Sequence, residues 1–291
     1  MKLGTLKDSR AIAVQDAGSD CQFVALNSLG FNGSLQDLLP DDAALSTLQA
    51  RLHDAEWQPL ELGQLAVPVT APPKIICVGL NYRRHALEAG MAVPTQPVVF
   101  TRFLTTLVNP FDAVQHDSSL TQQLDYEVEL AVVIGRGGKR IAREDALGHV
   151  FGYTVCNDIS ARDLQLGPDT GGQWTRGKNL DMSCPLGPWI VTRDELPDPQ
   201  RLRLRCEVNG SVLQDSSTAD MIFSVEEIVH RLSHWFTLQS GDVIITGTPE
   251  GVGFTRQPPI FLRPGDHTSA WIEGIGAISN QIVAVGHGDP A

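Results

Sequence analysis

The sequence predicts a β-rich α+β protein, with a small N-terminal α/β domain over residues 1–66 and a larger domain over residues 74–291. From residue 74 onward, short apolar runs rich in β-branched residues alternate with Gly and Pro turns, which is typical of strands. Three prolines fall within residues 65–74. Because proline continues neither a helix nor a central strand, we place a Pro-rich linker over residues 67–73.

The N-terminal part combines strand-like runs with one helical pattern. The segments AIAV (11–14) and CQFVAL (21–26) are short and apolar. In residues 41–53, three leucines recur at helical spacing and fall on one face. We therefore expect a helix over 41–53 beside short strands.

The larger part carries one clear helix and one clear hairpin. Residues 224–238 place their apolar side chains in one stripe, with Ser224 as the expected N-cap and Glu227 completing a capping box. In VNGS (208–211), the Asn-Gly pair predicts the tight turn of a hairpin. Other helical patterns are few, so strands dominate the prediction.

Charge and composition exclude several classes of protein. The 291 residues include 34 acids and 22 Lys plus Arg, a net charge of −12, which argues against binding nucleic acid or an anionic membrane surface. No apolar stretch approaches the length of a membrane-spanning helix, and the N-terminus lacks the apolar core of a signal peptide. The five cysteines are widely spaced, as expected of reduced thiols. We expect a cytoplasmic protein that acts on small molecules.

Two glycine-rich segments do not support nucleotide binding. GGQWTRGKN (171–179) lacks the Ser or Thr that follows the lysine of a P-loop, and prolines soon follow it. GIGAIS (274–279) lies near the C-terminus rather than at a first βα turn, so we interpret it as a turn between strands. No G-x-S-x-G elbow occurs, so a serine nucleophile of the α/β-hydrolase type has no support.

The segment LDYEVELAVVIG (124–135) predicts a buried strand that carries acids. Because a strand alternates faces, Asp125, Glu127 and Glu129 share one face. A solvated edge face is one interpretation of such a pattern. The strand continues as LAVVIG, however, which is apolar on both faces and belongs inside a sheet. Buried acids need a cation, and a divalent metal ion meets that need.

Asp158 is the candidate for a third ligand, because it ends a strand-like run, GYTVCND (152–158). The alternative is an N-cap for the helical segment ISARDLQ that follows, and the local sequence favours neither interpretation. A ligand set made only of carboxylates selects hard cations, so Mg²⁺ or Mn²⁺ is favoured over Zn²⁺.

Three further residues are candidates for acid–base or oxyanion chemistry. His85 and Glu88 lie three apart, where a carboxylate orients an imidazole as a general base, or where the two form a plain surface pair. Gly90 follows them and suits a flexible lid. Lys178 lies in a polar loop, either as a solvated lysine or as a cation that supports an oxyanion or enolate. Thr248, in a glycine-rich turn, can direct a hydroxyl toward an anion or simply belong to a tight loop.

The order of the motifs resembles one known family. Between about residues 74 and 282 the chain carries, in sequence, NYxxHxxE, DYEVELAVVIG, NDISARDLQ, RGKNLD, CPLGPWIV, ITGTPEGVG and PGD…IEGIG. This order resembles the fumarylacetoacetate hydrolase family, in particular bacterial two-domain members similar to acylpyruvases and isomerases. The N-terminal 66 residues resemble, more loosely, the small domain that many bacterial members carry.

The resemblance implies a mixed β-roll catalytic domain over 74–291, a homodimer, and Mg²⁺ or Mn²⁺ as the cofactor. The residues that match the family's motifs carry four roles: metal ligands Glu127, Glu129 and Asp158; a water-activating pair His85 and Glu88 in a mobile lid; an oxyanion lysine, Lys178; and substrate contacts Gln165 and Thr248.

We expect an enzyme that hydrolyses a C–C bond in a 2,4-dioxo acid, an acylpyruvate of the fumarylpyruvate or maleylpyruvate type met in aromatic catabolism. His85, oriented by Glu88, would deprotonate the attacking water, while the metal and Lys178 would hold the enolate that is released. Oxaloacetate decarboxylation and isomerisation or hydration of a hydroxymuconate-type acid use the same enolate and remain alternatives. A non-catalytic metal- or ligand-binding homologue is an alternative of another class, but it predicts a lost ligand or pair residue, and none is lost.

Two departures from the family's pattern concern the substrate. Many members have Lys-Pro after the PVxF strand, where this chain has Thr101, Arg102 and Phe103, and many have Ser-Phe-Asp where this chain has Asn-Leu-Asp over 179–181. Arg102 and Arg176 are candidates for contacting a second substrate carboxylate, and the sequence places neither side chain.

Overall fold

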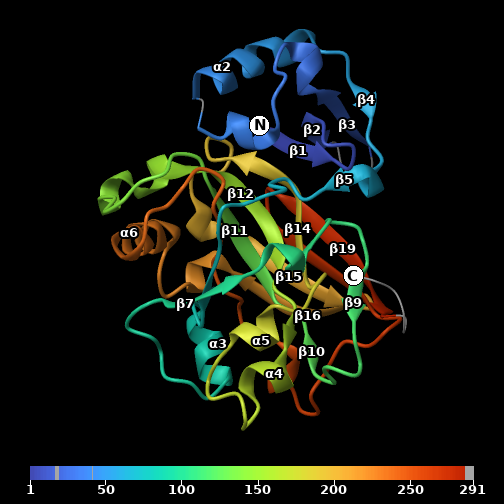
Figure 1. Ribbon diagram of the computed structural model, residues 1–291, viewed down its shortest axis with the longest axis vertical. Helices are drawn as coiled ribbons and strands as arrows, with labels where there is room; N and C mark the ends of the chain where they lie inside the picture. Colours follow the sequence, from blue (N-terminus) through green and yellow to red (C-terminus); the bar gives the residue numbers. More distant parts are fainter. Residues whose placement is uncertain (17–19, 41, 286–291) are drawn as a thin grey trace.

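The computed structural model describes residues 1–16, 20–40 and 42–285, whose strands form two sheets and one short pair (Figure 1). The β-rich α+β class predicted from the sequence is confirmed. Both sheets are mixed, because each contains parallel as well as antiparallel neighbours.

The larger sheet runs from the N-terminal strands through the centre of the protein. Its order is β4-β3-β2-β1-β14-β12-β11-β17-β6-β7, with β5 beside β1 and β8 beside β14. The strands are β1 (Lys2–Leu6), β2 (Ala11–Asp16), β3 (Cys21–Ala25), β4 (Gln58–Pro59), β5 (Leu65–Ala66), β6 (Ile75–Gly79), β7 (Val98–Arg102), β8 (Leu107–Val108), β11 (Val128–Ile134), β12 (Val150–Asn157), β14 (Cys184–Thr192) and β17 (Val243–Ile245). Since β1 pairs antiparallel with β14, the N-terminal strands extend the central sheet.

The segment predicted as a linker packs against the N-terminal strands. No helix or strand covers residues 67–73, but Val67 and Val69 are buried and the Thr5 hydroxyl donates to the Pro68 carbonyl at 3.0 Å. The division into domains over 1–66 and 74–291 stays a prediction.

The second sheet has the order β16-β15-β18-β19-β9 and packs on the larger one. Its strands are β9 (Val114–His116), β15 (Arg203–Val208), β16 (Ser211–Ser217), β18 (His267–Ile272) and β19 (Gly276–Ala284). The predicted hairpin is confirmed: β15 and β16 pair up to Val208 and Ser211, and Asn209 and Gly210 both have positive φ, as a tight primed turn requires.

Strand β11 lies at the centre of the packing. All seven of its residues are buried, as predicted from its apolar run. Leu130 and Val132 belong to the core shared with the second sheet and α6, whereas Ala131 and Val133 belong to the core shared with β6 and α1. A strand covered on both faces holds any polar side chain that it carries away from bulk water.

The helices are short. They are α1 (Leu35–Leu38), α2 (Asp42–Arg51), α3 (Arg83–Glu88), α4 (Arg162–Leu166), α5 (Thr175–Lys178) and α6 (Val225–Trp235). The helix expected over 41–53 is present as α2 followed by a 3₁₀ turn at Leu52–Asp54, and Asp41 lies outside the described residues. Figure 1 shows α3, α4 and α5 gathered at the end of the molecule opposite the N-terminal strands.

The helix expected over 224–238 is α6, which ends at Trp235. Its N-cap is Ser224, whose hydroxyl accepts the Glu227 N–H at 3.2 Å. The second half of the expected capping box is absent, because the Glu227 carboxylate pairs with Arg143 and Arg231 instead.

The single strand expected over 124–135 is wrong in one respect: it is broken. Strand β10 (Leu124–Asp125) pairs with β13 (Ser160–Ala161), and β11 begins at Val128. The break arises because side chains take the intervening backbone groups. Asp125 accepts the N–H of Tyr126 at 2.9 Å, and the side chain of Asn157 accepts the N–H of Glu127 at 3.0 Å.

Candidate active site

Three carboxylates meet where β11 and β12 run side by side. Glu127 precedes β11, Glu129 lies on it, and Asp158 follows β12, where its N–H donates to the Glu127 carbonyl at 2.8 Å. All three are buried, and each offers an oxygen within 4.8 Å of the others. We call these residues the acidic cluster. The structure thus brings together the three predicted metal ligands.

The alternative interpretation of Asp158 as an N-cap is not supported. The N-cap of α4 is Ala161. The two oxygens of Asp158 instead bind cations: Oδ1 accepts a hydrogen bond from Nε of Arg102, and Oδ2 accepts one from Nζ of Lys178. Its buried side chain therefore belongs to the acidic cluster.

Lys178 is not a solvated lysine. It is buried, and its Nζ donates to Glu127 Oε2 at 2.7 Å and to Asp158 Oδ2. Gly177 makes this placement possible, because a Cβ there would lie 2.5 Å from the Cβ of Gln165 and 2.6 Å from the Ala161 carbonyl. The close approach of α5 to α4 brings the lysine to the cluster.

Two arginines complete the charge balance. Arg162 pairs with Asp125 at 2.8 Å and with Glu127, and its guanidinium lies 4.5 Å from the ring of Phe254. The sequence analysis did not identify Arg162, although the acids that share one face of the predicted strand indicated that a cation lies beside them. Arg102, a candidate for contacting a second substrate carboxylate, is buried against Asp158 and does not line the pocket. Arg176 is exposed and donates to the Asp169 carbonyl.

The cluster retains one carboxylate without a direct cation partner. Burial favours the neutral form of Glu127, but the ammonium of Lys178 and the guanidinium of Arg162 hold its pKa well below the usual value. Burial, reinforced by Asp158 and Glu127, raises the pKa of Glu129 well above its usual range. Among the described residues, the Glu129 carboxylate accepts a hydrogen bond only from the Gly247 N–H.

Lys178 stays charged in this environment. Burial disfavours the ammonium form, but the carboxylates of Asp158 and Glu127 outweigh that cost and raise the pKa of Lys178. Counted as ionised, the four acids of the region, the acidic cluster and Asp125, face three cations, Arg102, Arg162 and Lys178, which leaves one negative charge.

The donor set fits a divalent ion. Three buried carboxylates with no sulfur or imidazole among them are ligands that Mg²⁺ and Mn²⁺ prefer. A charge of +2 would convert the region from one formal negative charge to one positive charge and would supply the cation that Glu129 lacks. A positive site suits an anionic substrate, even though the whole chain carries −12.

His85 and Glu88 form a pair on α3. The His85 side chain is buried, and its Nδ1 lies 3.1 Å from Glu88 Oε1, so Nε2 remains for the pocket. Glu88 also accepts the Gly251 N–H at 3.0 Å from each oxygen, which ties α3 to the loop after β17. The surface-pair interpretation fails for His85, because its ring lines the same pocket as the acidic cluster.

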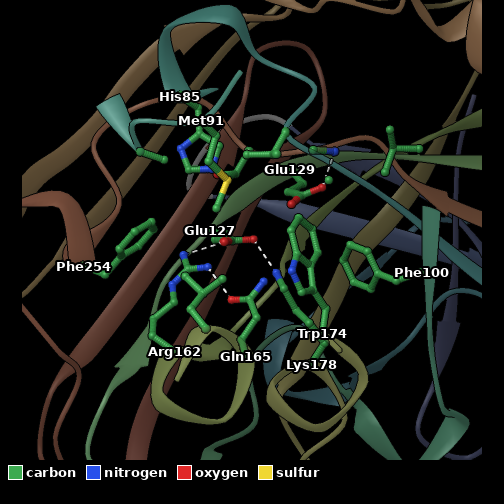
Figure 2. A pocket seen from close by; sticks show the side chains of 17 residues that line it. His85, Met91, Phe100, Glu127, Glu129, Arg162, Gln165, Trp174, Lys178 and Phe254 are labelled. Atoms are coloured by element: carbon green, nitrogen blue, oxygen red, sulfur yellow. Dashed lines mark hydrogen bonds and ion pairs between the residues drawn. The ribbon is translucent and has the colours of Figure 1, made fainter. Parts of the chain in front are cut away.

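Figure 2 shows how the pocket is arranged. His85 lies on one side, Lys178 and Gln165 on the other, and Glu127 between them. Aromatic and aliphatic side chains form the remaining walls: Met91, Phe100, Leu166, Trp174 and Phe254. The cavity volume is about 30 Å³, room for about two water molecules at roughly 10–15 Å³ each.

The two predicted substrate contacts line this pocket and differ in what they offer. Arg162 donates to Gln165 Oε1 at 2.9 Å, which leaves the Gln165 Nε2 group as a donor for the cavity. The Thr248 hydroxyl donates to the Val128 carbonyl at 3.1 Å and accepts from Gln214 at 2.9 Å, so its proton is already used.

Comparison with known proteins identifies the family. Residues 74–283 match the family model described as fumarylacetoacetate (FAA) hydrolase C-terminal. The chain belongs to the fumarylacetoacetate hydrolase family. The resemblance found in the sequence is thereby confirmed.

Relatives with named activities share most of the chain. Oxaloacetate tautomerase YisK of Bacillus subtilis is 49% identical over 222 residues, which are 75% of this chain and 73% of the relative. The mitochondrial oxaloacetate tautomerase FAHD2A of Bos taurus is 48% identical over 216 residues, 74% of this chain and 68% of the relative. These relatives are enzymes, as the sequence predicts for this chain.

Solved structures of the family match nearly the whole chain. Fumarylacetoacetate hydrolase from Exiguobacterium antarcticum aligns with a TM-score of 0.80 at 38% identity, covering 98% of this chain and 100% of that chain. Maleylpyruvate hydrolase from Sphingobium sp. SYK-6, in complex with manganese(II) ion and pyruvate, aligns with a TM-score of 0.80 at 29% identity and the same coverage. The family fold predicted from the sequence is therefore confirmed.

None of the helices in the described part of the chain has the length and apolar character needed to span a bilayer.

Proposed function

We propose that this chain catalyses enol–keto interconversion of a small 2-oxo acid, with oxaloacetate as the expected substrate and Mg²⁺ or Mn²⁺ as the cofactor. The observation that carries the proposal is the His85 ring, which Glu88 orients through Nδ1 and which lines the same pocket as the acidic cluster. Such an oriented imidazole beside a metal site can move a proton on a bound 2-oxo acid. The identity of 48–49% with oxaloacetate tautomerases supports the same choice.

The acidic cluster would hold the divalent ion, which supplies Lewis-acid polarisation of the 2-oxo group when bound. Lys178 supports the same oxygen. Its ammonium has three N–H donors, two of which donate to Glu127 and Asp158. The third is available for the oxygen that becomes negative in an enolate.

His85 would move the proton. In the keto-to-enol direction, Nε2 takes a proton from C3, the C–H electron pair forms the C2–C3 double bond, and the carbonyl pair moves to the C2 oxygen to give the enolate. A proton from solvent on that oxygen completes the enol, and His85 returns its proton to solvent. Ketonisation reverses these transfers. Glu88 holds the ring through Nδ1, which fixes the tautomer that leaves Nε2 able to accept. Gln165 Nε2 is placed to donate to a substrate oxygen.

Hydrolysis of an acylpyruvate, the reaction expected from the sequence, is the second candidate. The observation in its favour is the same oriented pair, because His85 held by Glu88 can deprotonate a water as well as a carbon acid. The likeness to maleylpyruvate hydrolase also supports it. Decarboxylation of oxaloacetate and isomerisation of hydroxymuconate-type acids would pass through the same enolate, and a binding protein without catalysis would show none of these reactions.

A substrate panel separates these reactions. Enol-oxaloacetate, maleylpyruvate, fumarylpyruvate and a hydroxymuconate-type acid are each offered with Mg²⁺ and with Mn²⁺, and kcat/KM is compared. Loss of the enol absorbance reports ketonisation, pyruvate release from acylpyruvates reports hydrolysis, and CO₂ release reports decarboxylation. We expect ketonisation to have the highest kcat/KM. Efficient pyruvate release with no ketonisation would replace this proposal with the second candidate.

We also propose that the chain works as a homodimer, which rests on the family resemblance. Light scattering on the purified chain tests it, and a monomer at micromolar concentration would contradict it.

A further inference from the structure

Arg102 is a buried cation of the site that has no part in the reaction proposed above. It is the last residue of β7, its side chain is fully buried, and it is not among the residues that line the pocket. A substrate carboxylate in the pocket would therefore face Arg162, Gln165 or Lys178, whereas Arg102 contacts only the far side of the acidic cluster through Asp158. Its influence must pass through the groups that it touches.

The guanidinium links β7 to two other segments, residues 158–159 and Ser183. Nε donates to Asp158 Oδ1, Nη2 donates to the Ile159 carbonyl, and Nη1 donates to the Ser183 hydroxyl at 3.0 Å. Ser183 is itself fixed, because its hydroxyl donates to the Leu180 carbonyl. The planar fork of an arginine reaches a carboxylate, a carbonyl and a hydroxyl at once, which the compact ammonium of a lysine does less well.

Asp158 is consequently held from two sides. Arg102 takes Oδ1 while Lys178 takes Oδ2, and both cations are buried. Glu129, by contrast, receives only one backbone N–H among the described residues. Of the three carboxylates, Asp158 thus depends most on a neighbour outside the pocket for the direction in which its oxygens point.

We infer that Arg102 is a positioning residue for the acidic cluster: it fixes the orientation of Asp158 and so sets the affinity of the cluster for a divalent cation. Residues that orient metal ligands through a second hydrogen bond typically change metal affinity by about 10–100-fold when removed. The inference rests on the metal site of the proposed function but not on the reaction or the substrate.

The test measures Mn²⁺ binding directly, by calorimetry and by the electron paramagnetic resonance spectrum, on the full chain without substrate. Arg102→Gln removes the charge and the planar guanidinium. Arg102→Lys keeps the charge but not the guanidinium, and Ser183→Ala removes the hydroxyl that accepts from Arg102 Nη1. Arg176→Gln is the matched control, because that arginine is exposed and bonded only to a backbone carbonyl. Circular dichroism verifies that each variant is folded.

We expect Arg102→Gln to weaken Mn²⁺ binding by about 10–100-fold, Arg102→Lys to recover part of that loss, and Arg176→Gln to match the wild type. The spectrum of the Mn²⁺ that remains bound should change in Arg102→Gln. Wild-type affinity and spectrum in a folded Arg102→Gln chain would overturn the inference. If that variant does not fold, unchanged affinity and spectrum in both Arg102→Lys and Ser183→Ala would overturn it. A wild type that binds Mn²⁺ but ketonises no oxaloacetate would contradict only the proposed reaction.

Discussion

The floor and the lid of the pocket are built in different ways. The floor is the acidic cluster, whose carboxylates lie at the junction of two central strands; two of them, Glu127 and Asp158, contact buried cations. The lid is α3, a helix of six residues whose outer face is exposed and whose tip is held by Glu88 bonds to the Gly251 N–H. The floor is preorganised for charge, whereas the helix that we treat as the lid carries His85, the proposed proton carrier. Variants of the two should therefore fail differently.

The largest effect is expected at the floor. Glu127→Gln removes a metal ligand and the shared partner of Lys178 and Arg162, so we expect both metal binding and turnover to be lost. Breaking a buried ion pair from one side costs about 3–5 kcal/mol, so chemical denaturation should show a lower free energy of unfolding. The exposed Glu56→Gln is the control. Full activity in Glu127→Gln would contradict the account of the floor.

The next effect belongs to the lid. His85→Ala removes the proton carrier but no member of the acidic cluster, so Mn²⁺ affinity should remain while kcat falls by about 10²–10⁴-fold. Calorimetry and steady-state kinetics on the same preparation give both numbers, with the exposed His53→Ala as control. Loss of metal binding in His85→Ala would contradict the claim that the floor binds the metal independently of the lid.

A smaller effect is expected for Glu88→Gln. The amide keeps one oxygen, which can accept from both His85 and the Gly251 N–H as Glu88 Oε1 does, but it loses the second oxygen and the charge that stabilises an imidazolium. We expect kcat to fall by about tenfold, roughly 1.4 kcal/mol, with unchanged Mn²⁺ affinity. A loss as large as that of His85→Ala would indicate that Glu88 itself transfers the proton.

The last comparison concerns the effect of the metal on stability rather than on rate. The floor already contains three buried cations, so removing the ion with a chelator should leave the chain folded but inactive. At a hundred times its Kd, a bound ion adds about 2.7 kcal/mol, which differential scanning calorimetry detects as a higher Tm. Unfolding by the chelator would show that the acidic cluster requires the bound ion in order to remain folded.

The same contrast explains what the sequence could predict. Glu127, Glu129 and Asp158 lie at the ends of strand patterns, and His85 and Glu88 lie within one helical turn, so short-range periodicity made them candidates and the family resemblance gave them roles. The cations are a different case. Arg162 meets Asp125 across 37 positions and Arg102 meets Asp158 across 56, and these partners depend on tertiary packing.

The break between β10 and β11 had the same cause. It depends on Asn157, a residue of another strand, whose side chain accepts the Glu127 N–H. The periodicity of a single strand does not predict such a contact between strands. Likewise, the pairing of β1 with β14 joins residues that are far apart in the sequence.

The central claim is that His85 moves a proton on a carbon that the floor activates, and proton exchange tests it most directly. Pyruvate is incubated in D₂O with the Mg²⁺-loaded chain, and loss of the methyl signal is followed by ¹H NMR, a reaction that needs neither hydrolysis nor decarboxylation. The account predicts rapid exchange with the wild type, and none above background with His85→Ala although that variant still binds the metal. No exchange with the wild type, or equal exchange with both chains, would contradict it.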